Sequence, residues 1–105
     1  MLGDLEQVVM LATLRLDGLG YGVTIQTAIR SIAERDLTLG TIHKTLTRLE
    51  VKELVASRMG AASPHRGGRA KRHYAVTALG VRELKATLRS IQRLAAGLRL
   101  GFDPP

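Results

Sequence analysis

The stretch TLGTIHKTLTRLEVK, residues 38–52, decides the fold of this chain. Thr38 is a favourable N-cap, and an apolar residue then recurs every three or four positions, as on the buried face of a helix. These apolar positions are Leu39, Ile42, Leu46 and Leu49. The opposite side is polar and has no carboxylate before Glu50; it carries Thr41, His43, Lys44, Thr47 and Arg48, with Thr45 at the boundary. We therefore predict an amphipathic helix whose polar face suits base edges and phosphates.

A β-hairpin is predicted directly after this helix. Residues 54–59 and 72–77 both alternate with a period of two, which is typical of short strands, and we expect them to pair. The connection over residues 60–71 is basic, and no acidic residue occurs from Leu54 to Leu79. Its backbone groups and charges need water or phosphate oxygens around them. The hairpin is therefore expected to protrude from the domain.

Further helices are predicted before and after these elements. The first begins at Asp4, which can cap it, with Gln7 reaching back as in a capping box. A second amphipathic helix begins near Tyr21, and Thr77 is placed to cap a final one. The order α-α-α-β-β-α predicts a mainly α fold with a small β-hairpin, the winged helix-turn-helix.

The final helix, expected over residues 78–100, carries an apolar seam of about two and a half heptads. A seam of this length exceeds what the core of one small domain needs, so it predicts a homodimer. The expected interface consists of Leu5, Val9, Val81, Leu84, Leu88, Ile91, Ala95 and Leu98. The 105 residues thus form one domain, a winged-helix core over residues 1–77 followed by a C-terminal dimerisation helix.

The charge of the chain is unevenly distributed. Lys and Arg number 16 against 9 Asp and Glu, which gives a net charge of +7. Residues 1–36 hold three basic and five acidic groups, whereas residues 37–105 hold thirteen basic and four acidic groups. An excess confined to one part of the chain indicates a surface for a polyanion, either nucleic acid or an anionic membrane. Together with the predicted fold, this distribution favours double-stranded DNA as the partner.

The candidate DNA contacts come from the predicted third helix and from the hairpin. We expect Lys44 to meet a guanine edge or a phosphate, and Arg48 to meet the DNA backbone. The hydroxyls of Thr41 and Thr45 are candidates for base contacts. The full set is Thr41, His43, Lys44, Thr45, Arg48, Arg66, Arg69, Lys71 and Arg72.

Several other functions are excluded by what the sequence lacks. It has no cysteine, which excludes thiolate metal sites and a cysteine nucleophile. His43, His65 and His73 fall on three different predicted elements, so we expect no metal site. No nucleophile with a placed base and no cofactor loop can be assembled, so neither an enzyme nor a cofactor is expected. The longest apolar run, residues 8–12, is too short to span a membrane, and we expect a cytoplasmic protein.

The sequence resembles the PadR-type transcriptional regulators, specifically the short members with one C-terminal helix. The resemblance covers nearly the whole chain and rests on motifs in register: Leu2-Gly3, Tyr21-Gly22-Val23, Thr38-Leu39-Gly40-Thr41-Ile42, Leu46-Thr47-Arg48-Leu49-Glu50, Leu54-Val55, Arg66-Gly67-Gly68-Arg69-Ala70-Lys71-Arg72 and Tyr74-Ala75-Val76-Thr77-Ala78-Leu79-Gly80. It implies a dimeric DNA-binding regulator, usually a repressor. It also implies that a small aromatic or drug-like effector often relieves DNA binding.

The sequence departs from the family pattern at three positions. His43 stands where the family usually has tyrosine, and His73 stands at the first of two usual strand tyrosines. Glu53 stands where a glycine commonly ends the third helix; a left-handed backbone there would cost on the order of 1 kcal/mol. Aromatic residues are also few, and an effector of unknown identity would find little to stack against. They are Tyr21, Tyr74 and Phe102, of which both tyrosines are expected in packing.

The favoured function is a sequence-specific regulator, a repressor, that binds a pseudo-palindromic operator as a homodimer. The alternative is a winged-helix module that binds protein without specific DNA binding, for which the basic hairpin would be dispensable. A small RNA-binding protein is disfavoured, because exposed aromatic side chains for stacking on bases are lacking.

Overall fold

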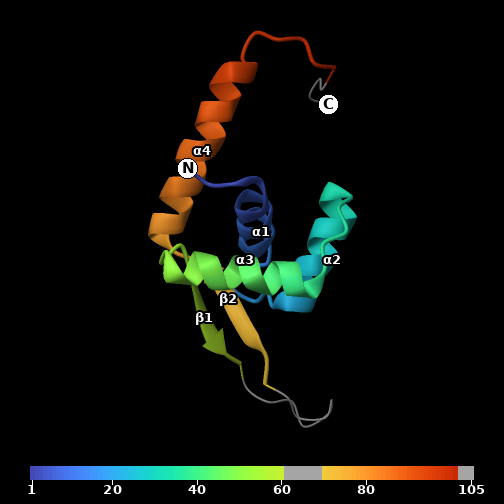
Figure 1. Cartoon of the computed structure of the whole chain (residues 1–105), viewed down its shortest axis with the longest axis vertical. Coiled ribbons are helices and arrows are strands. Elements are labelled where there is room, and N and C mark those ends of the chain that lie inside the picture. Colours follow the sequence, from blue (N-terminus) through green and yellow to red (C-terminus); the bar gives the residue numbers. More distant parts are fainter. Residues whose placement is uncertain (61–69, 102–105) are drawn as a thin grey trace.

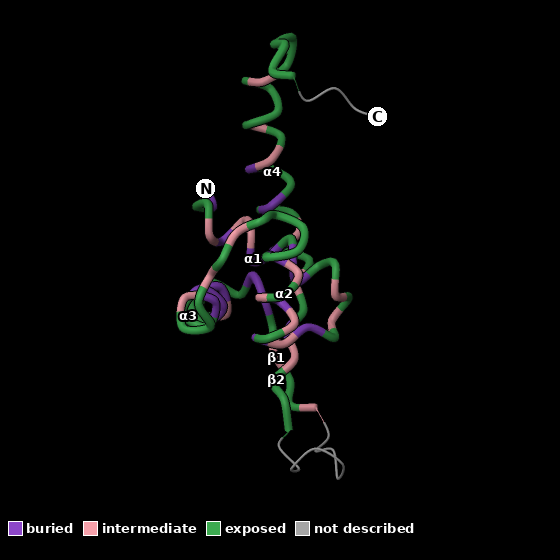
Figure 2. Tube along the Cα trace, turned by 90° about the vertical axis from the view of Figure 1, so that its right-hand side faces the viewer, coloured by how far each residue is buried: buried purple, intermediate pink, exposed green. Residues whose placement is uncertain are grey.

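The structure, a computed structural model, describes residues 1–60 and 70–101. Within these ranges it confirms the predicted order of three helices, a hairpin and a final helix (Figure 1). The elements are α1 (Asp4–Arg15), α2 (Gly22–Ala33), α3 (Leu39–Val51), β1 (Val55–Met59), β2 (Arg72–Val76) and α4 (Ala78–Ala95). The long shape of the molecule comes from its two ends, because the hairpin and α4 extend in opposite directions (Figures 1 and 2).

The two threonine caps lie where the sequence predicts them. The N–H of Thr41 donates to the hydroxyl oxygen of Thr38 at 3.1 Å, at the start of α3. The N–H of Gly80 donates to the hydroxyl oxygen of Thr77 at 3.0 Å, at the start of α4. Each bond satisfies one of the N–H groups that a helix leaves without an internal partner.

The predicted cap of α1 is wrong by one residue. Gly3, not Asp4, has the extended backbone of an N-cap, with φ −76° and ψ 172°. Its N–H donates to Oε1 of Glu6 at 3.0 Å, so Glu6 takes the role predicted for Gln7. The Gln7 side chain instead donates to the carbonyl of Leu2 at 3.0 Å. The side chain that reaches back is always three residues after the cap, so the two errors have one cause.

The hydrophobic core lies around α1, which contacts α2, α3, β2 and α4. Its members include Val9, Met10, Ile25, Ile42, Leu46 and Leu49, all fully buried. Two residues predicted for the dimer interface belong to this core, because Val9 is fully buried and Leu84 is only 3% exposed. The prediction that Val9 and Leu84 lie in a dimer interface is therefore wrong. Helix α1 lies at the centre of the fold and contacts α4, so both side chains are already covered within one chain.

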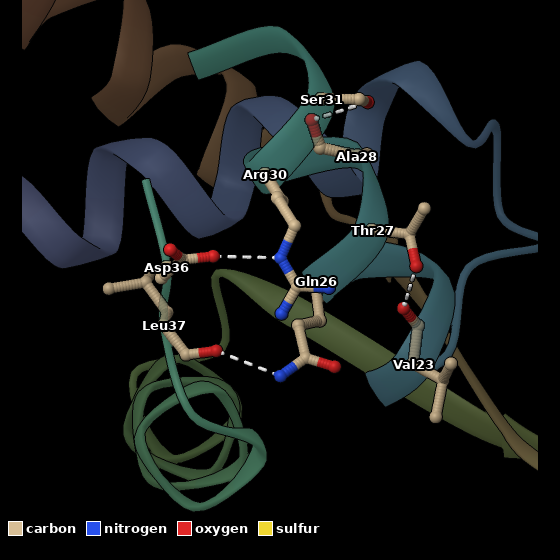
Figure 3. Close-up of polar contacts among 8 residues, drawn as sticks. All are labelled: Val23, Gln26, Thr27, Ala28, Arg30, Ser31, Asp36 and Leu37. Atoms are coloured by element: carbon tan, nitrogen blue, oxygen red, sulfur yellow. Dashed lines mark hydrogen bonds and ion pairs between the residues drawn. The ribbon is translucent and has the colours of Figure 1, made fainter. Parts of the chain in front are cut away.

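The connection from α2 to α3 is held by side chains of α2 (Figure 3). The Gln26 side-chain amide donates to the carbonyl of Leu37 at 2.9 Å. The Arg30 guanidinium donates to the Asp36 carboxylate at 2.8 Å. Glu34, directly after α2, has a left-handed backbone with φ 55°. These contacts set where α3 begins relative to α2.

The hairpin is joined to the loop between α1 and α2. β1 and β2 pair antiparallel, with Ser57 opposite Tyr74. On the other edge of β2, the N–H of Tyr74 donates to the carbonyl of Gly20 at 2.9 Å, and the two residues form a β-bridge. The Tyr74 ring is buried, and burial together with the nearby Glu50 carboxylate raises the pKa of its hydroxyl, although Arg72 lowers it. The bridge therefore fixes the root of the hairpin next to the start of α2.

The backbone is left-handed at Glu53, between α3 and β1, with φ 62°. This geometry lets the N–H of Leu54 donate to the carbonyl of Leu49 at 2.9 Å, which closes the end of α3. A residue other than glycine adopts this left-handed backbone at a cost of about 1 kcal/mol. Gly80 is required for a different reason, because a Cβ at that position would collide with the carbonyl oxygen of Leu54.

Candidate functional site

The exposed side of α3 is polar and carries no carboxylate before Glu50. We call it the α3 polar face; it consists of His43, Lys44, Thr47 and Arg48, all exposed. Within residues 1–60 and 70–101, neither Lys44 nor Arg48 forms an ion pair. Thr47 was not among the predicted contacts, although its helical spacing already placed it on this side. Two cations beside hydroxyl and imidazole side chains can bind phosphates and base edges.

Thr45 does not belong to this face. Its side chain is only 2% exposed, and its hydroxyl donates to the carbonyl of Thr41 at 2.8 Å. A hydroxyl in that position cannot reach a base edge, so the predicted base contact of Thr45 is wrong. Thr45 lies at the boundary between the polar and apolar sides of α3, and in the structure its side chain is on the buried side. Thr41 is half-buried, and its hydroxyl accepts from the hydroxyl of Thr38 at 2.9 Å.

The other cation at the end of α3 is already paired. Lys52 Nζ lies 2.7 Å from Oε2 of Glu6, which is buried in α1. Burial by itself would raise the pKa of Glu6, but the hydrogen bonds from Lys52 and from the Gly3 N–H outweigh it and lower that pKa. Glu6 is therefore ionised at neutral pH and ties α3 to α1.

His43 links the α3 polar face to the start of α2. A Cβ at Gly22 would lie 2.9 Å from Nε2 and 3.0 Å from Cε1 of His43, closer than real contacts allow. The imidazole therefore lies directly against the backbone of Gly22. Only glycine accommodates this approach without a shift of the ring.

Tyr21, one residue earlier, links the start of α2 to the hairpin. The ammonium nitrogen of Lys71 lies 4.6 Å from the centroid of the Tyr21 ring. The His73 ring packs edge to face on the same ring, with centroids 5.9 Å apart and planes at 88°. The α3 polar face, the start of α2 and the root of the hairpin thus form one continuous surface. Sequence reasoning missed Tyr21, since only the pairing of Gly20 with Tyr74 brings it near Lys71.

The predicted hairpin contacts differ in their surroundings. Lys71 and Arg72 are both exposed. Arg72 donates to the hydroxyl of Ser57 at 3.0 Å, and that hydroxyl donates to the Glu50 carboxylate at 2.9 Å. Arg72 is thereby held toward the end of α3. The predicted contacts Arg66 and Arg69 lie outside the described residues.

A second surface is apolar and lies on other parts of the fold. A groove of about 240 Å³ lies between α1 and α2, lined by Val8, Leu11, Ala12, Arg15, Ala28, Ile29, Ile32 and Ala33. Of the predicted interface, Leu5, Val81, Leu88 and Ala95 are half-buried in one chain. Ile91 and Leu98 are 51% and 62% exposed, and Leu94, which was not predicted, is 80% exposed. The second half of α4 and the residues after it thus present apolar side chains that this chain does not cover. Leu98 lies in that following segment, because the helix ends at Ala95 and not at residue 100 as predicted; Ala96 has an extended backbone.

Neither a metal site nor a membrane segment is found in the part of the chain that the structure describes. No three His, Asp or Glu side chains there are grouped to hold a metal ion. None of the described helices combines the length and the apolar character needed to cross a membrane.

The surface described above occurs on a fold with known relatives. The sequence model of the transcriptional regulator PadR-like family matches residues 10–86. Among solved structures, a PadR-like transcription factor from Bacteroides fragilis is 26% identical, with a TM-score of 0.72 over 86% of this chain and 82% of that chain. A PadR family transcription regulator from Clostridium difficile R20291 is 25% identical, with a TM-score of 0.68 over 88% and 95% of the two chains. F93 from STIV, a winged-helix DNA-binding protein, shares the fold at 11% identity, with a TM-score of 0.68 over 94% and 100%. No curated protein matches the sequence.

Proposed function

Because the chain belongs to the PadR-like family of transcriptional regulators, we propose that it is a sequence-specific repressor that binds duplex DNA as a homodimer. In this proposal α3 is the recognition helix and enters the major groove, while the hairpin acts as the wing along the DNA backbone. The protein acts in the cytoplasm, on the DNA of its own cell. The observation that carries the proposal is the α3 polar face, where Lys44 and Arg48 form no ion pair with any described residue, on a helix whose opposite side is buried in the core.

The homodimer is supported by the uncovered apolar side chains of α4 and of the segment that follows it. Ile91, Leu94 and Leu98 are more than half exposed, which is costly in water and is relieved when a second copy covers them. Two copies related by a two-fold axis would present two recognition helices. Their operator would then be a pseudo-palindrome with half-sites about one helical turn, or a multiple of it, apart.

A small-molecule effector is not part of this proposal. The apolar groove between α1 and α2 has aliphatic side chains and Arg15 in its lining, but no aromatic ring on which a flat ligand could stack. We assign this groove and the exposed half of α4 to contacts between the two copies.

The DNA-binding proposal is tested by selection and by charge reversal. Selection from random duplexes should enrich one pseudo-palindrome, and the DNA upstream of the protein's own gene should be compared with a scrambled duplex by fluorescence anisotropy at two salt concentrations. The double substitution Lys44→Glu and Arg48→Glu should weaken binding to the selected duplex by at least about 100-fold, since it removes two contacts and adds repulsion. Circular dichroism and sedimentation should show that this variant is folded as before.

The matched control reverses two charges on the exposed side of α4, with Arg82→Glu and Arg89→Glu. It changes the net charge equally and should leave sequence discrimination unchanged. If selection enriches no sequence, and binding to native and scrambled duplexes is equal and lost with salt, sequence-specific recognition is contradicted. Negligible duplex binding even at low salt would favour a protein-interaction module, and preferential competition by single-stranded RNA would favour an RNA-binding protein.

A further inference from the structure

The ring of Tyr21 lies against the outer end of the described hairpin. This residue is the N-cap of α2 and is half-buried, with Lys71 over its face and His73 against it edge to face. The strand ends hold both partners in place. The N–H of Gly60 donates to the carbonyl of Lys71 at 2.7 Å, and a Cβ at Gly60 would lie only 2.6 Å from Cε1 of His73. The backbone of Lys71 and the ring of His73 are therefore fixed at the strand ends, and the Lys71 ammonium lies over the Tyr21 ring.

The partner of Lys71 differs in kind from the carboxylates that form the ion pairs of the described residues. Lys52 and Arg35 each pair with a carboxylate, which cancels their charge. An aromatic ring attracts a cation through its quadrupole and carries no net charge of its own. The Lys71 ammonium is therefore held over a ring while it keeps its full positive charge and its exposure to solvent.

The location of this ammonium matches that of a DNA backbone contact. Tyr21 precedes Gly22, on which the His43 ring of α3 lies, and Gly20 pairs with Tyr74 of β2. Lys71 thus lies at the outer end of the described hairpin, over the residue that precedes α2, and His43 of α3 packs against the first residue of the same helix. A cation fixed before binding loses less conformational freedom when it meets a phosphate than a mobile one does.

We propose that Tyr21 is a positioning residue: its ring holds the Lys71 ammonium at the junction of α2 and the wing, where it binds a phosphate of the DNA backbone. This inference rests on the proposed DNA-binding function. It assigns a role to Tyr21, and it gives Lys71 a phosphate as its ligand in preference to a base edge.

The test is a double-mutant cycle measured on the selected duplex over a range of salt concentrations. Lys71→Gln should reduce the slope of log affinity against log salt by about 1, because one phosphate contact is lost, and it should weaken native and scrambled duplexes alike. Tyr21→Leu should weaken binding about threefold in the presence of Lys71, an effect of the size of an exposed cation–π contact. In the Lys71→Gln background the same substitution should have no effect, and Tyr21→Phe should bind as the parent protein does.

Lys85→Gln, on the exposed side of α4, is the matched control for the loss of one positive charge, and its salt slope should equal that of the parent. A second measurement needs no DNA. The ε-methylene protons of Lys71 should be shifted upfield by the ring in the parent protein and in Tyr21→Phe, but not in Tyr21→Leu. Thermal unfolding of each variant shows that it is folded.

Three results would overturn the inference. Equal losses for Tyr21→Leu with and without Lys71 would mean that the ring only supports the fold. An equal loss for Tyr21→Phe would assign the effect to the hydroxyl. An unchanged salt slope in Lys71→Gln would mean that Lys71 meets no phosphate. In each of these cases the parent protein still discriminates its duplex, so only this inference fails. If the parent protein selects no duplex, both the proposed function and this inference are contradicted.

Discussion

Helices α3 and α4 have similar sequence patterns but differ in how far their apolar side chains are buried. Each begins at a threonine cap, and each has apolar residues three and four positions apart. The apolar side chains Ile42, Leu46 and Leu49 of α3 are all fully buried within one chain. In α4 only the first half is covered: Leu84 is 3% exposed, whereas Ile91 and Leu94 are 51% and 80% exposed.

The difference teaches that an amphipathic pattern shows which face of a helix needs covering but not what covers it. Helix α3 packs against α1, α2 and β1, so its apolar face is closed by its own chain except at Leu39, which is 38% exposed. Helix α4 is covered by the rest of the fold only from its start to its middle, where the Leu2 N–H donates to the hydroxyl of Thr87 at 3.3 Å. Its second half extends past the other helices (Figure 1).

The largest expected effect is a difference in unfolding free energy between a leucine-to-alanine substitution in α3 and one in α4. Leu46→Ala should lower the free energy of unfolding by about 3 kcal/mol, because it leaves a cavity in a closed core. Leu94→Ala, the same substitution at an exposed site, should change it by less than about 0.5 kcal/mol at protein concentrations where the chain is monomeric. Urea unfolding measures both. Equal losses would mean that α4 is covered within one chain, and the comparison would fail.

The second expected effect is on the association constant of the proposed homodimer. Leu94→Asp places a charge in the apolar stripe of α4, and it should weaken the proposed dimer by at least about tenfold, because a charge is costly in an apolar interface. Sedimentation equilibrium measures the association constant. Gln92→Asp introduces the same charge at an exposed polar position of the same helix and serves as the control. A dimer that tolerates Leu94→Asp but not Gln92→Asp would place the interface on another side of α4.

The smallest effect concerns the ion pair that ties α3, but not α4, to α1. Because the fold lowers the pKa of Glu6 below its ordinary 4.5, the unfolded chain binds more protons in that range. The stabilisation is thus present above pH 4.5 and is lost as the pH falls through the lowered pKa. Glu6→Gln should cost about 1 kcal/mol at neutral pH, since the Lys52 end of the pair is half exposed.

This variant should also show a shallower decrease in unfolding free energy between neutral pH and pH 3 than the parent protein. Asp36→Asn removes a carboxylate from the exposed pair with Arg30 and should have little effect at neutral pH. Unfolding in urea at a series of pH values measures both variants. Parallel curves for the parent and Glu6→Gln would show that the pair does not stabilise the attachment of α3.

The candidate site was only partly predictable from the sequence. Lys44 and Arg48 are correctly placed on the exposed side of α3, because helical periodicity separates them clearly from Leu46 and Leu49. Thr45 lies at the boundary of that face, where a small rotation decides between solvent and core, and the prediction for it is wrong. The role of Tyr21 has no local signal at all.

The order of the elements, the caps at Thr38 and Thr77, and the basic character of α3 and the wing follow from local spacing and charge. Each of these features depends on residues a few positions apart, so the sequence is enough to predict it. The burial of Val9 and Leu84 within one chain, and the contact of Tyr21 with Lys71, follow from the three-dimensional packing. Those outcomes depend on contacts between residues far apart in sequence, such as the pairing of Gly20 with Tyr74, and no local pattern encodes them.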